Sequence, residues 1–318
     1  MGRQIGDYQL EELTQYRPCL TRQPDFLQYW QDMKQQLSPK VKVDLEKQPY
    51  DVKGINLYKG KLLSWDATPL GMMVIEPNTH QRCCTVVVCF HGYTGDYGYP
   101  HFYLKYALQG MTVVSFDVRG QGFTPDYALY SNGHRIPGWM LKGIEEPNSY
   151  YYTNIYRDLI VALNWVKESF NADLMIVEGS SQGGGLALAA GALCDHVDVI
   201  LAGCPFLANF ERAFQIAMSG PHMEIVNFFK TQDPQYTLKD QIFITLSYID
   251  VMNFAPLISC PVLLSAGLED SCTPPSTIYA IYNHLESEVR QLEVYPQHGH
   301  EHIPDFEEKK LSFLSNFL

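Results

Sequence analysis

Short apolar runs alternate with helical patterns along most of the chain. The runs are rich in β-branched residues and each ends close to a Gly, Asp or Pro, which is typical of buried strands. They cover residues 86–90, 111–116, 174–177, 197–201, 261–266 and 292–295. Between them, residues 154–167 carry apolar side chains at helical spacing, and residues 186–193 are apolar all round. This alternation predicts an α/β fold, in which helices cover both faces of a mostly parallel central sheet.

The first 80 residues have a different pattern. They predict one amphipathic helix at about residues 25–37 and strand-like segments at 52–63 and 71–75. We expect these strands to be antiparallel and to extend one edge of the sheet. No repeat, low-complexity tract or linker separates them from residues 81–318, which carry the catalytic sheet and its helices. The sequence therefore predicts a single α/β domain over residues 1–318.

Composition narrows the range of partners. Hydrophobic residues make up 46% of the 318 residues and charged residues only 18%, so the chain can bury a large core. The formal net charge of -12 argues against nucleic acid and against anionic membrane surfaces as partners. The longest apolar runs are also far shorter than the roughly 18 residues that a spanning helix needs.

The eight cysteines contain no C-x-x-C pair, and most lie in apolar runs. They are interpreted as reduced, buried thiols rather than as metal ligands. The first residues lack the apolar centre of a signal peptide, and the chain has no N-x-S/T acceptor site. Together these features predict a cytosolic protein.

The segment Gly179-Ser180-Ser181-Gln182-Gly183 fits the pattern G-x-S-x-G. A predicted strand precedes it, and a glycine run and the buried helix follow it. This is the strand, sharp turn and helix of a nucleophile elbow, in which small neighbours allow close passage of the flanking chains. Ser181 is therefore the candidate nucleophile, with the helix N-terminus adding a positive field.

A serine hydroxyl needs a base, and in this architecture the acid and then the histidine follow the serine along the chain. Asp270 follows the predicted strand at 261–266, and His300 follows the last one. Both lie where parallel sheets place their active sites, in loops at the carboxyl ends of strands. Glu269 and His298 are close competitors for the two roles.

An oxyanion hole needs two backbone N–H donors. The first candidate is the amide of Gln182, directly after the nucleophile, and the second is the amide of Tyr93, in the loop after the strand at 86–90. His91 lies in the same loop. We interpret it as a scaffold residue that hydrogen-bonds the loop, in preference to a second base.

At these positions the sequence resembles carbohydrate esterase family 7, whose members are acetyl xylan esterases and cephalosporin C deacetylases. The resemblance runs from about Leu10 to the C-terminus. Its most specific features are Arg119-Gly120-Gln121, Ser181-Gln182-Gly183-Gly184 and His300-Glu301. Further matching segments are Asp25-Phe26, Tyr29-Trp30, His91-Gly92-Tyr93, Asp270, Thr273-Pro274-Pro275-Ser276-Thr277, Tyr282-Asn283-His284-Leu285-Glu286 and Gly299.

The resemblance implies an α/β-hydrolase fold and a serine esterase that removes acetyl groups from small sugars and from cephalosporin C. It implies Ser181, Asp270 and His300 as the triad, the Tyr93 and Gln182 amides as the oxyanion hole, and a cytosolic homohexamer. Arg119 and Gln121 match a motif that we interpret as structural support near the site. His298 and His302 stand where the family more often has aromatic residues. The tyrosine-rich loop 93–100, which starts at Tyr93, is a candidate for sugar binding.

Three alternatives stay open. His298, His300 and His302 with Glu301 could form a metal cluster, but alternating residues of an extended segment point to opposite sides, so we expect no metal and no cofactor. A non-catalytic binding module would not need a serine, an acid and a histidine in this order. Another serine hydrolase, such as a short-chain carboxylesterase, a thioesterase or a peptidase, is compatible with the fold.

Overall fold

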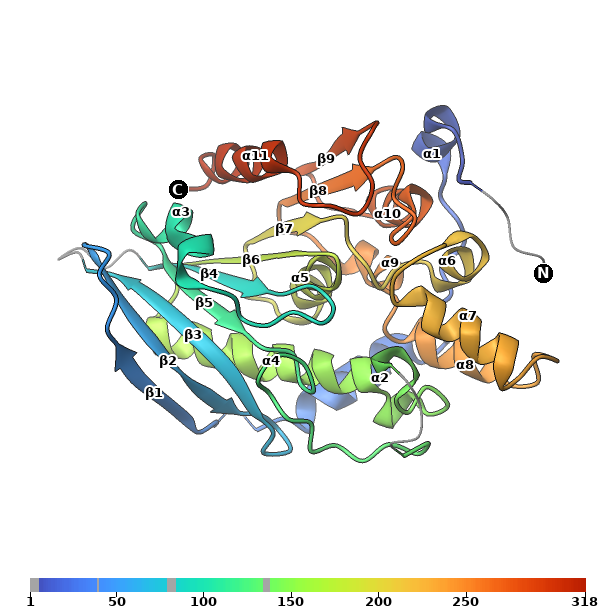
Figure 1. Cartoon of the computed structure of the whole chain (residues 1–318), viewed down its shortest axis with the longest axis horizontal. Coiled ribbons are helices and arrows are strands. Elements are labelled where there is room, and N and C mark those ends of the chain that lie inside the picture. The colour runs from blue at the N-terminus through green and yellow to red at the C-terminus, as the bar shows by residue number, and fades with distance from the viewer. Residues whose placement is uncertain (1–5, 39, 79–83, 134–137) are drawn as a thin grey trace.

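A computed structural model describes residues 6–38, 40–78, 84–133 and 138–318 (Figure 1). One nine-stranded sheet forms its centre, with the strand order β1-β2-β3-β5-β4-β6-β7-β8-β9. The strands are β1 (Val43–Gln48), β2 (Ile55–Leu63), β3 (Pro69–Pro77), β4 (Thr85–Phe90), β5 (Thr112–Phe116), β6 (Leu174–Ser180), β7 (Val199–Gly203), β8 (Val262–Gly267) and β9 (Arg290–Tyr295).

The six strands from β5 to β9 in the sheet are parallel, and β1, β2 and β3 continue the edge in antiparallel pairs. This confirms the predicted α/β fold with a mostly parallel sheet. The strand order reverses at β4, because the chain leaves it toward β5 and returns to its other side at β6. The carboxyl ends of β4 and β6 therefore lie at a topological switch point, where open α/β sheets bind their ligands.

Two apolar layers cover the sheet, because successive side chains of each buried strand point to opposite faces. Val88 and Phe90 face one layer and Val87 and Cys89 the other. The first layer includes α2 (Phe26–Gln35), α4 (Tyr151–Phe170) and α5 (Gln182–Leu193), and the second includes α3 (Leu104–Ala107) and α11 (Pro304–Leu314).

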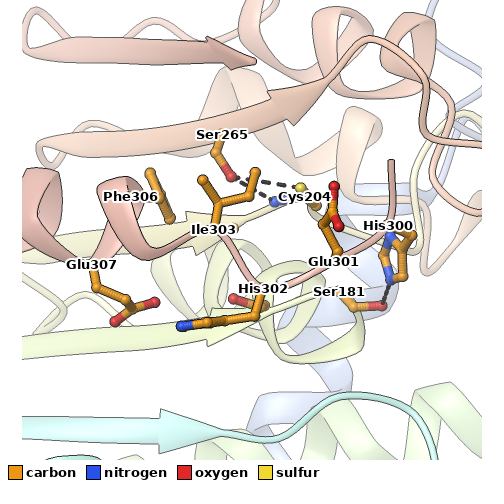
Figure 2. Close-up of a pocket in the computed structure, with 11 residues that line it drawn as sticks. Ser181, Cys204, Ser265, His300, Glu301, His302, Ile303, Phe306 and Glu307 are labelled. Carbon is orange, nitrogen blue, oxygen red and sulfur yellow. Dashed lines mark hydrogen bonds between the residues drawn. The ribbon is translucent and has the colours of Figure 1, made fainter. Parts of the chain in front are cut away.

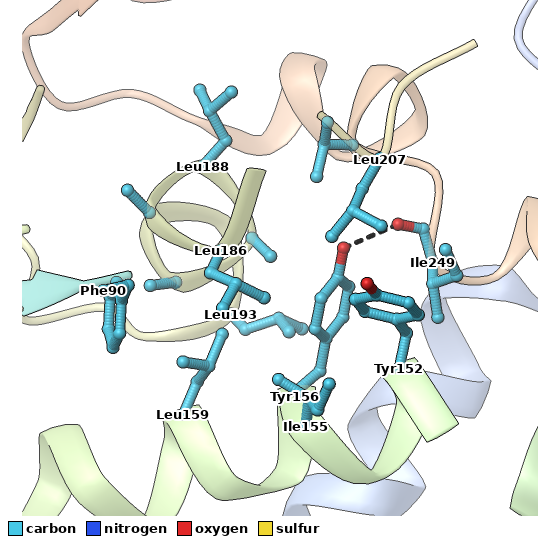
Figure 3. Packing of buried hydrophobic residues seen from close by; sticks show 14 of the residues in the cluster. Phe90, Tyr152, Ile155, Tyr156, Leu159, Leu186, Leu188, Leu193, Leu207 and Ile249 are labelled. Atoms are coloured by element: carbon cyan, nitrogen blue, oxygen red, sulfur yellow. Dashed lines mark hydrogen bonds between the residues drawn. The ribbon is translucent and has the colours of Figure 1, made fainter. Parts of the chain in front are cut away.

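Figure 3 shows the first layer at close range, where α4 packs against α5. The phenol of Tyr156 on α4 donates a 2.7 Å hydrogen bond to the carbonyl oxygen of Ile249. The buried hydroxyl is thus satisfied inside an apolar core, which avoids the cost of an unpaired polar group.

The remaining helices lie mainly beyond the carboxyl ends of the strands (Figure 1). They are α1 (Leu10–Gln15), α6 (Phe210–Ile216), α7 (His222–Thr231), α8 (Lys239–Ser247), α9 (Val251–Phe254) and α10 (Pro275–Tyr282). Short 3₁₀ turns span Pro100–Tyr103, Trp139–Leu141, Pro147–Ser149 and Ala255–Leu257. Within the described ranges, every helix is too short or too polar to cross a lipid bilayer.

Candidate active site

A strained turn joins β6 to α5 and presents Ser181 at its apex. Ser181 has φ 57° and ψ −119°, a backbone conformation that residues other than glycine rarely adopt. The turn is held by the Ser181 N–H, which donates to the Gly203 carbonyl at 2.8 Å, and by the Ser181 carbonyl, which accepts from Phe206 N–H at 2.9 Å. The strain therefore persists because the end of β7 and the segment that follows it hold both peptide groups of the residue.

The small residues around Ser181 are required by close backbone contacts. A Cβ at Gly179 would lie 2.3 Å from the backbone of Gly183, and a Cβ at Gly183 would lie 2.0 Å from the Phe90 carbonyl oxygen. Neither position can hold a larger side chain without moving the backbone. The spacing predicted for a nucleophile elbow is thus explained by the packing of β4, β6 and the start of α5.

The structure brings Ser181, His300 and Asp270 into one chain of hydrogen bonds. His300 Nε2 lies 2.9 Å from Ser181 Oγ, a contact drawn in Figure 2, and His300 Nδ1 lies 2.7 Å from Asp270 Oδ2. The competitors lie elsewhere. Glu269 is exposed, and the ring of His298 packs edge-on against Tyr295. The geometry therefore favours Asp270 and His300 over both.

Asp270 is buried, and both oxygens of its carboxylate accept hydrogen bonds. One oxygen accepts the N–H groups of Cys272 and Thr273, both at 2.8 Å, and the other accepts the Thr273 hydroxyl at 2.7 Å as well as His300. These donors satisfy the oxygen atoms of a buried carboxylate. They also fix its orientation, so the imidazole is held with Nδ1 toward Asp270 and Nε2 toward the serine.

Two opposing effects set the charge of His300. Burial alone would lower its pKa, but the hydrogen bond and the negative charge of Asp270 outweigh burial and raise the pKa above its ordinary value of 6.5. Asp270 thus stabilises the imidazolium, the form that a base acquires when it takes a proton from serine.

The two candidate oxyanion donors are the N–H groups of Gln182, at the start of α5, and of Tyr93, in the loop after β4. Gln182 is the first residue of α5, so its N–H has no carbonyl partner within the helix. The side chain of Gln121 links the loop that begins at Tyr93 to the start of α5. Its Oε1 accepts the Thr94 N–H at 3.0 Å, and its amide exchanges hydrogen bonds of 3.0 and 3.2 Å with the Gln182 side chain. The loop and the helix start are therefore held in a fixed relation.

His91 supports the same loop. Its Nε2 accepts the Val118 N–H at 2.9 Å and its Nδ1 donates to the Gly92 carbonyl at 2.7 Å. Burial lowers the pKa of His91, which favours the neutral ring that this pattern needs. Both ring nitrogens are occupied by backbone groups, as expected for a scaffold residue.

Arg119 lies away from the reacting groups, fully buried beside α4. Its Nε and one terminal nitrogen each donate to Asp158 at 2.6 Å, and the other terminal nitrogen donates to Asp66 at 2.8 Å. This bidentate pairing satisfies a buried charge. It agrees with the interpretation of Arg119 as structural support.

Two hollows of about 680 and 270 Å³ open beside Ser181, and both are lined by Ser180, Ser181, His302 and Glu307. Figure 2 shows side chains that line the smaller one. The larger hollow, called here the α3–α11 groove, also has Phe102 and Tyr103 on its wall. His302 of the sequence-predicted histidine trio therefore lines both hollows, while His300 faces the serine.

Four charged side chains line the α3–α11 groove and balance one another. Lys310, buried on α11, lies 2.5 Å from Glu178 Oε1 and 2.7 Å from Glu307, and Lys105 contacts the same two carboxylates. Burial alone would raise the pKa of Glu178, but the two lysines lower it to about 2. The groove is thus rich in donors and acceptors without net charge.

Sequence reasoning missed several residues that shape the site. Lys310 and Glu224, which bonds to the Tyr93 phenol, belong to no short motif and reach the site only through the fold. Thr273 lies in a segment that matches the family, but its hydrogen bonds to Asp270 were not predicted. Across residues 6–38, 40–78, 84–133 and 138–318, no three His, Cys, Asp or Glu side chains are grouped so that they could hold a metal ion.

Comparison with known proteins gives one consistent answer. The family model of acetyl xylan esterases matches residues 3–317. The acetyl xylan esterase from Paenibacillus sp. R4 has a similar structure with a TM-score of 0.92 at 39% identity, covering 98% of this chain and 100% of that one. Acetyl xylan esterase 1 from Thermoanaerobacterium sp. JW/SL YS485 follows with a TM-score of 0.90 at 29% identity, covering 98% and 99%.

A curated relative, the acetyl esterase Axe7A of Xylanibacter ruminicola, is 28% identical over 159 residues. The match covers 49% of this chain and only 34% of that protein, so the chain spans about a third of its length. The family model and the two structures, by contrast, cover nearly the whole chain. The chain belongs to the acetyl xylan esterase family.

Proposed function

We propose that the protein is a serine esterase that removes acetyl groups from small acetylated saccharides, such as xylo-oligosaccharides, through an acetyl-enzyme intermediate. The observation that carries the proposal is the hydrogen-bonded chain Ser181–His300–Asp270 at a strained elbow. Membership of the acetyl xylan esterase family supports the acetyl ester as the bond that is cleaved. Cephalosporin C, whose acetoxymethyl group is the same kind of ester, is proposed as a second substrate.

We propose a two-step mechanism, which this geometry supports. His300 Nε2 takes the proton from Ser181 Oγ as the oxygen attacks the acetyl carbonyl carbon. The negative charge that develops on the carbonyl oxygen is stabilised by the N–H groups of Tyr93 and Gln182. His300 then protonates the leaving sugar hydroxyl, and water hydrolyses the acetyl-enzyme by the same steps. Asp270 orients the imidazole and stabilises its charged form throughout.

The α3–α11 groove supports a neutral sugar as the leaving group. Sugars are recognised by hydrogen bonds to their hydroxyls and by flat aromatic surfaces. The groove offers the Lys105, Glu307 and His302 side chains together with the half-exposed ring of Phe102. Its volume of about 680 Å³ lies within the usual range for small-ligand sites. Because its four charges cancel, we propose that a neutral saccharide fits it better than a charged one.

The assembly and the location remain proposals drawn from the family resemblance and the sequence. We propose a cytosolic homohexamer, in which enclosed active sites would admit short oligosaccharides and exclude polymeric acetyl xylan. Light scattering on the purified protein tests the assembly, and deacetylation rates on both substrate sizes test the selectivity. A monomer that processes the polymer as fast as the oligomer would contradict this part of the proposal.

The function itself is tested by an acyl-length series. We expect p-nitrophenyl acetate to be hydrolysed much faster than the butyrate and octanoate esters on one preparation. The same enzyme should release acetate from acetylated xylo-oligosaccharides. Preference for the octanoate ester, or activity on a peptide or thioester but not on acetylated sugar, would favour another class of serine hydrolase.

A further inference from the structure

The side chain of Tyr93 is anchored by a residue far along the chain. Its phenol donates a 2.5 Å hydrogen bond to Glu224 on α7, and the same phenol oxygen accepts the Trp139 N–H at 3.0 Å. The second oxygen of Glu224 accepts the Met140 N–H at 2.9 Å, and the Tyr93 and Trp139 rings meet edge-on at 5.1 Å. Glu224 thus joins α7 to the Tyr93 loop and to the segment at 139–140.

Glu224 is unusual for a structural carboxylate. It is partly buried, and among the residues the structure describes no lysine or arginine forms an ion pair with it. Burial raises the pKa of Glu224, because the charged carboxylate is less stable away from water. The chain also passes close to the carboxylate at Gly138, where φ is 90° and a Cβ would lie 2.0 Å from Glu224 Oε2. The surroundings are therefore shaped to retain this group.

We propose that Glu224 is a positioning residue of the oxyanion hole. Glu224 accepts the hydrogen bond of the Tyr93 phenol and so keeps the main-chain N–H of Tyr93 directed toward the carbonyl oxygen of the substrate. Gln121 accepts the N–H of the next residue, Thr94, so Tyr93 is held both through its side chain and through the peptide that follows it. The inference rests on the proposed function, which assigns the Tyr93 amide to the oxyanion.

The consequence is specific to the transition state. An oxyanion donor acts where charge develops and contributes little to the binding of the neutral ester. Loss of a whole donor costs about 10²–10³ in kcat, so a donor that is present but poorly aimed should cost about tenfold or more. A change at Glu224 should therefore lower kcat and leave KM nearly unchanged.

The test compares Glu224→Gln, Tyr93→Phe and the double variant on p-nitrophenyl acetate. Gln can still accept from the phenol but offers N–H₂ toward Met140, while Phe removes the phenol donor altogether. We expect each single variant to lose about tenfold or more in kcat at a KM within about twofold of wild type. The double variant should be no worse than the less active single variant, because both changes weaken the same link between α7 and the loop that begins at Tyr93.

A second readout separates positioning from general damage. A methyl trifluoromethyl ketone adds to the serine and places an oxyanion in the hole, so its inhibition constant should weaken in parallel with kcat. Matched controls are Glu211→Gln, an exposed glutamate on α6, and Tyr127→Phe, an exposed tyrosine. Both should keep wild-type kcat and ketone affinity.

Unchanged kcat and ketone affinity in Glu224→Gln and Tyr93→Phe would overturn the inference, and so would fully additive losses in the double variant. If Glu224→Gln fails to fold, Tyr93→Phe alone decides by the same two readouts. Neither outcome touches the proposed function, which instead fails if folded Ser181→Ala retains its activity.

Discussion

Asp270 Oδ2 lies 2.7 Å from His300 Nδ1, although Asp270 follows β8 and His300 follows β9. Adjacent parallel strands bring their carboxyl ends to one edge of the sheet, so two loops separated by a whole strand and helix meet there. Thr273 completes the arrangement. Its N–H and hydroxyl hold the aspartate, and the hydroxyl oxygen also lies 3.3 Å from His300 Nδ1.

Asp270→Asn should cost far more activity than Glu269→Gln. An amide can hold the ring but favours the wrong tautomer and does not stabilise the imidazolium, so we expect a loss of about 10⁴ in kcat. Glu269 is exposed, and Glu269→Gln should stay within a few-fold of wild type. Steady-state kinetics on p-nitrophenyl acetate measure both. Equal losses, or a larger loss for Glu269→Gln, would show that the acid was assigned wrongly.

The pH dependence should report the ionisation of His300. Only the neutral ring can accept a proton, and Asp270 raises the pKa of His300 above 6.5. kcat/KM should therefore rise as pH increases, with the midpoint of its acid limb above 6.5. In Asp270→Asn the negative charge beside His300 is absent, while burial still lowers the pKa of His300. The midpoint of the acid limb of kcat/KM should therefore move to lower pH. The same midpoint of the acid limb in the wild-type protein and in Asp270→Asn would contradict this effect of Asp270 on His300.

The order of the buried strands, and the residues that form the hydrogen-bonded chain Ser181–His300–Asp270, could be predicted because local sequence signals mark them. The strands at 86–90 and 174–177 are buried on both faces, so they appear as continuous apolar runs and match β4 and β6. β1 was not predicted, because it is a short edge strand of mostly polar residues with no buried position. The helices between β7 and β8 were also missed, because they are short and their apolar side chains pack on one another instead of forming one long stripe.

The contacts that support the site could not be predicted for a related reason. The glycines that the turn requires mark the position of Ser181 in the sequence. They mark the amide of Gln182 as well, because it is the next residue. Glu224 reaches Tyr93 across 131 residues, and Lys310 reaches Glu178 across 132. Nothing in the neighbouring sequence of either residue marks it, because the partner is supplied only by the packing of helices onto the sheet.

Lys310→Met should destabilise the protein strongly. Lys310 is 2% exposed and pairs with Glu178 and Glu307, and removing it leaves Glu178 with Lys105 at 3.6 Å as its remaining ion-pair partner. Breaking one partner of a buried ion pair costs about 3–5 kcal/mol in the free energy of unfolding. Lys309→Met, at the adjacent exposed position, should change it by less than about 0.5 kcal/mol. Denaturant unfolding measures both, and equal effects would contradict the role of the buried pair.

Chelation should leave the activity unchanged. The proposed mechanism uses only Ser181, His300, Asp270 and two amides, and His300 is committed to hydrogen bonds with the other two members of the triad. We expect the rate on p-nitrophenyl acetate to be the same before and after dialysis against EDTA. Loss of activity that added Zn²⁺ or Mn²⁺ restores would instead support the metal-dependent alternative.

The central claim is that Ser181 carries the acetyl group during turnover. Rapid quenching of the reaction with p-nitrophenyl acetate, followed by intact mass measurement and peptide mapping, tests it most directly. We expect a burst of p-nitrophenol and a single added acetyl group on Ser181, both absent from a folded Ser181→Ala variant whose rate falls by about 10⁴–10⁶. An acetyl group on another residue, or a Ser181→Ala variant that keeps more than about a tenth of the wild-type rate, would contradict it.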